Sequence, residues 1–506
     1  MKAHLLYRDR DFDLQQTLPP NAEALAQDLE LNTLFGAMAR GDEFLLQVAR
    51  QAVLSGLQDD LETILYRQHI LKDCLWNTSI VKGIYDIAVE SIEGKKKHHY
   101  GYFSRYPSGI LRGAGDLLQM FMGLLRKLRR IADEESDNFG SEGFVTFFTM
   151  LKTELTDEYF ASIERHLHEL KFREGVLVSA ELGQGNEGAN YVLRKSLAKK
   201  PGWIRRIFDR GPPSYTFHLH PRDEAGARAL SELRDRGIHL VANALAQSAD
   251  HILSFFVMLR TELAFYVGCA NLHGQLARWR GAVSFPVPAP AGTRRHSCVG
   301  LYDACLALSM ERGVVGNELD ADEKDLVIIT GANQGGKSSF LRSIGLAQLM
   351  MQCGMFVAAA SFSADLRCGL FTHYKREEDA TMESGKFDEE LGRMSEIVDA
   401  LTPHSMLLFN ESFAATNERE GSEIARQIVG ALLEAHVKVF FVTHLYDFAH
   451  GFFEQKMDHA VFLRAEREAD GRRTFKLLEG EPLQTSYGAD LYEEIFGAGA
   501  TRSGAG

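Results

Sequence analysis

The chain has 506 residues, a formal net charge of -13 at pH 7, and ordinary shares of hydrophobic (45%) and charged (25%) residues. This length predicts two to four domains, and the composition is typical of a globular protein. No uncharged apolar run is long enough to span a bilayer, and the charged start does not resemble a secretion signal, so we expect no membrane association. The 6 cysteines form no CxxC pair, which favours a reducing cytoplasm over a disulfide framework or a zinc site.

The first part of the chain, residues 1–282, is predicted to be a helical domain. Apolar residues recur there at helical spacing, for example between Leu117 and Leu128. A long helix is expected from about Glu224 to Leu276, with a break near Gly237. One glycine-rich stretch, residues 175–193, interrupts this pattern and predicts a short β excursion.

The second part, residues 283–497, is predicted to be an α/β domain. A proline- and glycine-containing stretch places the boundary near residues 283–290. Short apolar runs then alternate with helical patterns, which is typical of a mostly parallel sheet covered on both faces. The clearest of these runs are residues 326–330, 406–409 and 439–443. The last residues, 498–506, are predicted to be a disordered tail.

A phosphate-binding loop follows the first of these strands. The order is a strand, then G-x-x-x-x-G-K-S, then a helix, so backbone N–H groups of the loop and of the helix N-terminus would surround phosphates. Lys337 would reach the β and γ phosphates, and the Ser338 hydroxyl would ligate Mg²⁺. The nucleotide-binding residues are therefore predicted to be Gly331, Ala332, Asn333, Gln334, Gly335, Gly336, Lys337, Ser338 and Ser339.

Two later strands end in polar residues suited to hydrolysis. The strand at 406–409 runs into Asn410 and Glu411, and the next one ends near His444. An acid close to the γ-phosphate can orient or deprotonate the attacking water, and a histidine beside it can sense that phosphate. We expect Glu411, His444 and Lys337 to be the catalytic residues.

Several basic clusters stand out in a chain that is acidic overall. Residues 194–210 hold 7 Arg or Lys and one Asp, and shorter clusters occur at 95–97 and 126–130. Each cluster is either a DNA-contacting surface or a solvated face. The candidate DNA contacts are Arg194, Lys195, Lys199, Lys200, Arg205 and Arg206.

The motifs together resemble the ATPase domain of the MutS family, which belongs to the ABC-type ATPases. The resemblance is carried by TGANQGGKSS, ESGKF, NESFAATNEREGSEIA, VTHLYDFA and TSYGADLYEEIFG. Ala332 and Gln334 depart mildly from the usual loop of the family. The helical part resembles the core and lever region of the family over most of its length, but more weakly.

This resemblance implies ATP and Mg²⁺ at a homodimer interface, where Ser384 and Gly385 of one protomer face the nucleotide of the other. The amino-terminal mismatch-reading and connector domains and the carboxy-terminal helix-turn-helix are expected to be missing. The family's Phe-x-Glu triplet occurs at Phe172 and Phe387, but we interpret both as chance matches.

The family has Asp where this chain has Asn410, and that Asp contacts the Mg²⁺ shell. An amide can still accept a hydrogen bond from metal-bound water, and Glu411 is retained, so we expect slow but real ATP hydrolysis. The first hypothesis is an ATP-gated, DNA-binding homodimer without mismatch specificity of its own. The alternative is an ATP-gated switch that binds a protein partner and no DNA. An ABC transporter subunit is disfavoured, because the LSGGQ-like signature is missing from the sequence.

Overall fold

The computed structural model describes residues 1–97, 106–173, 175–194, 215–216, 218–376, 385–467 and 473–483. Those residues form two compact units that interleave along the chain. Unit 1 comprises Met1–Ala3, Ser79–Phe139 and Phe144–Thr261, and unit 2 comprises His4–Thr78, Gly140–Gly143 and Glu262–Gly506. The predicted boundary at 283–290 therefore marks the change from helices to strands. The last change from unit 1 to unit 2 lies earlier, between Thr261 and Glu262.

Unit 1 is built mostly of helices. They are α5 (Thr78–Lys97), α7 (Pro107–Glu135), α8 (Glu142–Glu154), α9 (Asp157–Glu169) and the first part of α11 (Glu224–Arg278). Helix α7 begins with a proline, which suits a position that has no intrahelical acceptor for its N–H. The apolar stripe predicted on this helix is buried, and Phe121 packs on Phe256 of α11 with ring centroids 5.7 Å apart. Packing of apolar faces thus holds the unit together.

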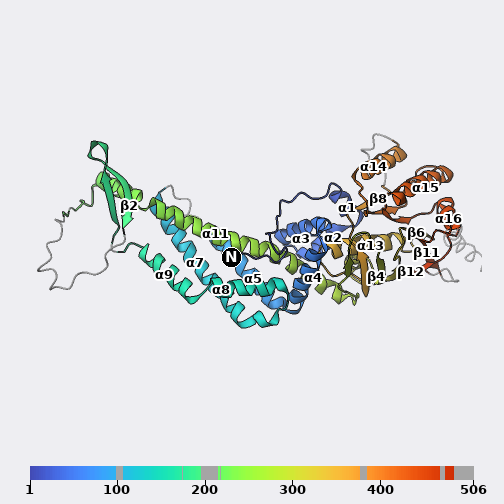
Figure 1. Cartoon of the computed structure of the whole chain (residues 1–506), viewed down its shortest axis with the longest axis horizontal. Coiled ribbons are helices and arrows are strands. Elements are labelled where there is room, and N and C mark those ends of the chain that lie inside the picture. The colour runs from blue at the N-terminus through green and yellow to red at the C-terminus, as the bar shows by residue number, and fades with distance from the viewer. Residues whose placement is uncertain are drawn as a thin grey trace, which may run out of the picture. The chain divides into compact units, whose positions relative to one another are not determined.

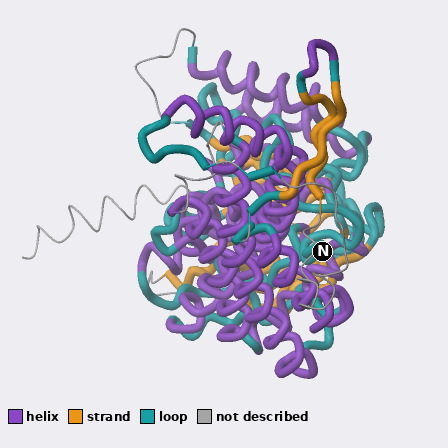
Figure 2. Tube along the Cα trace, turned by 90° about the vertical axis from the view of Figure 1, so that its left-hand side faces the viewer, coloured by secondary structure: helices purple, strands orange, loops and turns teal. Residues whose placement is uncertain are grey.

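The β excursion predicted at 175–193 is an antiparallel hairpin of β1 (Leu177–Leu182) and β2 (Gly188–Arg194). Figure 2 shows its strands in orange.

The break predicted in the long helix is wrong, because α11 runs through Gly237 without interruption for 55 residues. A Cβ on Gly237 would lie 2.5 Å from Cγ2 of Val178, so the glycine lets β1 approach the helix closely.

Helix α11, drawn in green in Figure 1, is long and apolar enough to cross a membrane, judged by length and composition only. Its most apolar 18-residue window has a mean hydropathy of 1.5. However, 67% of that window is buried inside the protein, as in the core helix of a globular protein.

Unit 2 begins with a group of short helices. These are α1 (Ala22–Asp28), α2 (Leu31–Ala39), α3 (Glu43–Ser55) and α4 (Leu61–Trp76). Their apolar faces are buried, and the side-chain carboxylates of Asp42 and Asp60 cap the first turns of α3 and α4.

The centre of unit 2 is a six-stranded sheet in the order β12-β11-β6-β10-β9-β8. All neighbouring pairs are parallel except β11 and β12, which are antiparallel. The strands are β6 (Leu326–Thr330), β8 (Leu370–Tyr374), β9 (Met406–Asn410), β10 (Lys438–Val442), β11 (Ala460–Arg467) and β12 (Arg473–Glu479). Since β6 and β10 are buried along their whole length, each contains a run of four apolar residues rather than an alternating pattern.

Four helices connect these strands: α13 (Lys337–Gln352), α14 (Lys386–Ala400), α15 (Glu418–Glu434) and α16 (Tyr446–Glu454). Figure 1 shows them, with the sheet, in the orange to red part of the chain. A smaller mixed sheet has the order β3-β7-β4-β5. Its strands are β3 (Val287–Ala289), β4 (His296–Leu301), β5 (Asn317–Asp320) and β7 (Ser361–Asp365), and α12 (Ala304–Met310) follows β4.

A buried carboxylate joins the start of unit 2 to the last turns of α11. Glu262 is fully buried and accepts the N–H of Leu5 at 2.6 Å and the N–H of Phe12 at 3.2 Å. Burial raises the pKa of Glu262 to about 7, because the charged form loses its hydration.

We predict that Glu262 makes stability fall as the pH rises. A carboxyl whose pKa is raised on folding contributes most below pH 4.5, its ordinary value, and that contribution is lost as the pH rises through about 7. The difference in unfolding free energy between the wild type and Glu262→Gln should therefore shrink by up to about 3 kcal/mol over this interval. Urea titrations at several pH values measure it, and a difference that is independent of pH would contradict the prediction.

Candidate nucleotide site

The phosphate loop connects β6 to α13 at the carboxyl edge of the six-stranded sheet. Gly331 and Gly336 have φ angles of 113° and 91°, which residues other than glycine rarely adopt. A Cβ on Gly335 would lie 2.7 Å from the Cβ of Ala465, on the neighbouring strand β11. The glycines therefore allow a tight turn that passes directly over the adjacent strand.

Lys337 folds back onto the loop. Its Nζ donates to the carbonyl oxygens of Gly331 and Ala332, both at 2.8 Å, and its side chain is 4% exposed. Burial lowers the pKa of Lys337 to about 8, and the nearby carboxylate of Glu411 opposes this shift. An anion in the loop would compete with the two carbonyl oxygens for this ammonium group.

Two oxygen atoms at the carboxyl edge are placed where Mg²⁺ would be held. The Ser338 hydroxyl donates to Oδ1 of Asn410 at 2.9 Å, which joins the first turn of α13 to the end of β9. A hydroxyl oxygen is a ligand that Mg²⁺ accepts, and an amide oxygen can accept from a metal-bound water, with the remaining positions taken by water and phosphate. The described residues contain no cluster of three or more His, Cys, Asp or Glu suited to a metal. The Ser338–Asn410 pair therefore fits a phosphate-bridged Mg²⁺ rather than an all-protein cage.

Glu411 and His444 contact each other next to this pair. The Nε2 atom of His444 lies 3.0 Å from Oε1 of Glu411, and both side chains are about one-third exposed. The hydrogen bond from His444 and the positive charges of Lys337 and Lys375 lower the pKa of Glu411, although partial burial opposes them. Glu411 is therefore ionised at neutral pH, as a base that orients water must be.

Among the remaining predicted residues, Gln334 is positioned by a contact with strand β12. Gln334 has a left-handed backbone (φ 58°), and its Oε1 accepts from Arg473 of β12 at 2.5 Å. Ala332, Asn333 and Ser339 lie in the loop and in the first turn of α13. Gly385 precedes the first turn of α14 as its N-cap, whereas Ser384 lies outside the described residues.

A cavity beside the phosphate loop was not anticipated from the sequence. It has a volume of about 340 Å³ and is lined by Gly336 and Ser339 of the loop and by apolar side chains that include Tyr302, Val315 and Phe475. Val315 and Phe475 remain 42% and 47% exposed, so they present apolar surface beside the loop. A flat, apolar group attached to loop-bound phosphates would cover them. These residues come from separate segments, so no sequence spacing could have shown the cavity.

Hydrogen bonds through Asn317 hold β12 against this cavity. Its Nδ2 donates to the carbonyl oxygen of Phe475 at 3.2 Å, and its Oδ1 accepts the N–H of Leu477 at 2.8 Å. Because Asn317 is only 5% exposed, the loss of these bonds would leave buried polar groups without partners. Phe475 is therefore held at the wall of the cavity.

The predicted DNA contacts fall mostly outside the described residues. Of that set only Arg194 is described; it lies at the end of β2, and its Nε donates to the Ser179 hydroxyl at 2.9 Å. Lys195, Lys199, Lys200, Arg205 and Arg206 lie outside the described residues.

The shorter basic clusters are partly neutralised by acidic side chains of unit 1. Arg126 pairs with Glu164 at 2.6 Å, and Lys127 pairs with Glu90 at 2.8 Å. Lys95 lies 3.4 Å from Asp250. These pairs support the solvated-face interpretation of the clusters at 95–97 and 126–130.

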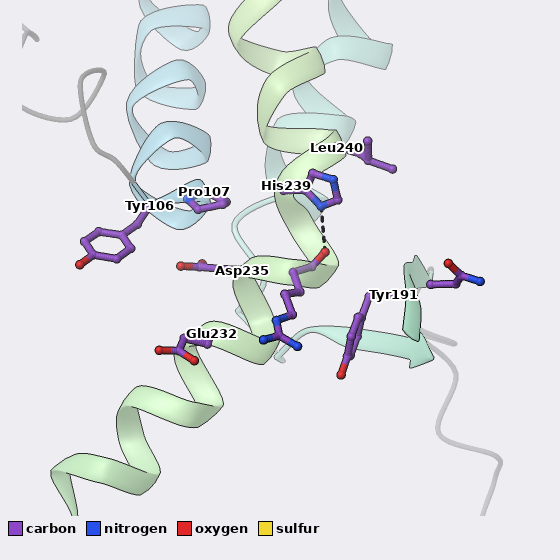
Figure 3. A pocket seen from close by; sticks show the side chains of 9 residues that line it. Tyr106, Pro107, Tyr191, Glu232, Asp235, His239 and Leu240 are labelled. Carbon is purple, nitrogen blue, oxygen red and sulfur yellow. Dashed lines mark hydrogen bonds between the residues drawn. The ribbon is translucent and has the colours of Figure 1, made fainter. Parts of the chain in front are cut away.

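A shallow hollow of about 700 Å³ lies on unit 1, between the start of α7, strand β2 and helix α11. Figure 3 shows Tyr106 and Tyr191 on opposite sides of α11, with Glu232 and Asp235 on the helix between them. Arg236 and His239 also line the hollow. Since acidic and basic groups are mixed there, the hollow does not form a uniformly positive surface for phosphates.

Comparisons with known proteins match both parts of the chain. Residues 59–279 match the family model of the MutS2 N-terminal domain, and residues 327–496 match that of MutS domain V.

Among individual relatives, the DNA mismatch repair protein MutS of Porphyromonas gingivalis is 34% identical over 161 residues, 31% of this chain and 18% of the relative. Endonuclease MutS2 of Thermus thermophilus is 35% identical over 132 residues, 26% of this chain and 18% of the relative. DNA mismatch repair protein MutS of Streptococcus mutans is 30% identical over 343 residues, 62% of this chain. The chain thus spans well under half of these relatives, at most 39% of their length.

We predict that Asn410→Asp lowers the Mg²⁺ concentration needed for half-maximal ATP hydrolysis. Aspartate keeps the oxygen that accepts from Ser338 and adds a negative charge, and a charged hydrogen bond contributes about 1.5–3 kcal/mol, or roughly tenfold to a hundredfold in Mg²⁺ affinity. Steady-state rates during a Mg²⁺ titration measure the effect. Asn417→Asp, at the cap of α15, is the matched control. An unchanged requirement with reduced turnover would mean that the site is adapted to the amide.

We predict that Val315→Trp weakens ATP binding by about tenfold or more, because the indole fills the space beside the loop. Binding of inorganic triphosphate should not change, since it needs only the loop. Val299→Trp is the control, because Val299 is similarly exposed (47%) on β4. Equal ATP affinity in the two variants would exclude the cavity from the nucleotide site.

Proposed function

The chain belongs to the MutS family, and from that premise we propose that it is an ATP-dependent DNA-binding protein that hydrolyses ATP slowly. The observation that carries this proposal is the convergence of five side chains at one edge of the sheet. Lys337 and Ser338 come from the phosphate loop, Asn410 and Glu411 from the end of β9, and His444 follows β10 beside Glu411. This set fits phosphoryl transfer to water.

In the proposed reaction Lys337 leaves the loop carbonyl oxygens and binds the β and γ phosphates. Ser338 would hold Mg²⁺ directly and Asn410 would hold it through a metal-bound water, and the ion would supply positive charge to the phosphate oxygens. Glu411 orients the attacking water and accepts its proton, while His444 keeps the carboxylate aligned and senses the γ-phosphate. Asn410 contributes no negative charge, so Mg²⁺ is held less firmly and turnover is slow.

The adenine of ATP is proposed to occupy the cavity beside the loop. Gly336 and Ser339 link this cavity to the phosphates, and Val315 and Phe475 offer apolar surface to a flat ring. The 340 Å³ volume is at the lower end of the usual range for ligand pockets, which suits a base rather than a whole nucleotide.

A homodimer is part of the proposal, with Ser384 and Gly385 of one protomer facing the γ-phosphate bound by the other. Support comes from the position of Gly385 at the N-terminus of α14, where anions are favoured. We place the protein in the cytoplasm, without a membrane partner. The proposal includes no mismatch recognition by this chain itself.

DNA binding is proposed to depend on the basic run at 194–210, which follows the β1–β2 hairpin. The alternative is an ATP-gated switch that binds a protein partner. The ion pairs of the other basic clusters and the net charge of -13 favour this alternative.

A salt titration of DNA binding separates the two. If the proposal is right, DNA affinity falls steeply with salt, and reversal of Lys199, Lys200, Arg205 and Arg206 to Glu reduces the slope by about one unit per lost phosphate contact. ATP should change the affinity of the wild type but not of Lys337→Ala, which cannot bind nucleotide. The measurement is filter binding of duplex, mismatched, branched and single-stranded DNA. No salt-dependent binding to any of them would favour the protein-partner switch.

A further inference from the structure

The peptide segment that carries Glu411 has an unusual backbone. Glu411 and Phe413 have φ angles of 56° and 62°, in the left-handed region that ordinary residues seldom adopt. Such a conformation persists only where surrounding contacts impose it. The N–H of Glu411 donates to the carbonyl oxygen of Val442 at 2.9 Å, which fixes one side of the segment to β10.

His373 of β8 contacts the other side of the same segment. Its imidazole is fully buried and stacks on the ring of Phe413, with centroids 5.4 Å apart and an interplanar angle of 18°. The Ser412 Oγ lies 2.7 Å from Nδ1 of His373 and 2.6 Å from its carbonyl oxygen. Burial lowers the pKa of His373 to about 4, so the ring is neutral and one nitrogen accepts while the other donates.

The donating nitrogen points to α14. The Nε2 atom of His373 lies 3.0 Å from the carbonyl oxygen of Glu390, which can only accept, so Nε2 carries the proton; the single hydroxyl proton of Ser412 is then shared between Nδ1 and the carbonyl oxygen of His373. The same Glu390 uses its side chain as well, because Oε1 accepts the N–H of Phe413 at 3.3 Å. One residue of α14 therefore binds the Glu411 segment twice, once through His373 and Ser412 and once directly.

Water cannot replace these contacts, because the residues that make them are buried. Ser412 and His373 are fully buried, and Glu390 is 3% exposed. On the opposite side, a Cβ on Gly421 would lie 2.3 Å from the carbonyl oxygen of Phe413, so α15 closes the remaining space. The segment cannot shift without moving α14 or breaking buried hydrogen bonds.

From this geometry we propose that Ser412, His373 and Glu390 are positioning residues that couple Glu411 to helix α14. The inference rests on the proposed function, in which Glu411 orients the attacking water. Helix α14 begins directly after its N-cap Gly385. A displacement of α14 would be transmitted through Glu390 to Glu411.

The test compares Ser412→Ala with Ser405→Ala in the full chain. Both serines are fully buried and hydrogen-bonded at the two ends of β9, but only Ser412 adjoins Glu411. Ser412→Ala should lower kcat by about tenfold, because small misplacements of a catalytic group are costly, while the Kd for ATP stays unchanged. Ser405→Ala should keep the wild-type kcat.

The Glu390 variants give a readout that a loss of stability alone would not move. Glu390→Gln keeps an oxygen acceptor for the N–H of Phe413 and should recover most of the kcat that Glu390→Ala loses.

Three results would overturn the inference. The first is equal kcat in Ser412→Ala and Ser405→Ala. The second is a joint loss of kcat and ATP affinity in Ser412→Ala, which would indicate general destabilisation. The third is the same kcat for Glu390→Gln and Glu390→Ala. Failure of the proposed function is distinguishable, because then the wild type itself would not hydrolyse ATP, or Glu411→Ala would hydrolyse it as fast as the wild type.

Discussion

The candidate site depends on the parallel alignment of three buried strands. Strands β6, β10 and β9 pair in register, with Ile329 opposite Val442 and Val442 opposite Asn410. Their carboxyl ends therefore meet at one edge, and whatever follows each strand is brought to the same place. The phosphate loop, the Asn410–Glu411 pair and His444 are distant in sequence, but the hydrogen bonds between strands make them neighbours. The run of four apolar residues in each of these strands follows from the same arrangement, because both faces of the sheet are covered.

The parts of this site that could be predicted from the sequence are those whose residues lie close together in the chain and follow a known spacing. The spacing of Gly331, Gly336 and Lys337 is contained in one loop, and its meaning follows from backbone geometry. The strand before Asn410 could be predicted in the same way. The cavity at Val315 and Phe475 could not, because it is assembled from segments that have no common pattern. His373 gave no signal either, since one histidine in an apolar strand is most often a buried structural residue. Gly237 was misjudged because a glycine in a helical pattern indicates a break as readily as a close approach by another element.

The basic clusters of unit 1 show that the number of cations in a cluster does not by itself identify a DNA-binding surface. The clusters at 95–97 and 126–130 are conspicuous in sequence, yet Arg126, Lys127 and Lys95 have carboxylate partners within the unit. Exposed pairs of this kind contribute little to stability, but they reduce the field available to a polyanion. The basic run at 194–210 differs in composition, since it holds 7 cations and a single Asp. Local charge balance, rather than the number of cations, decides which cluster is the better candidate.

The left-handed backbone at Gln334, Glu411 and Phe413 has an evolutionary consequence. Conformations of this kind cost of order 1–3 kcal/mol each, and glycine or asparagine would adopt them more easily. Selection for heat resistance alone would therefore favour replacing these three residues, whereas selection for ATP turnover would retain the glutamate and the contacts around it. Residues that serve ATP hydrolysis are thus among those that lower the stability of the fold. Selection for stability and selection for turnover therefore oppose each other at the same positions.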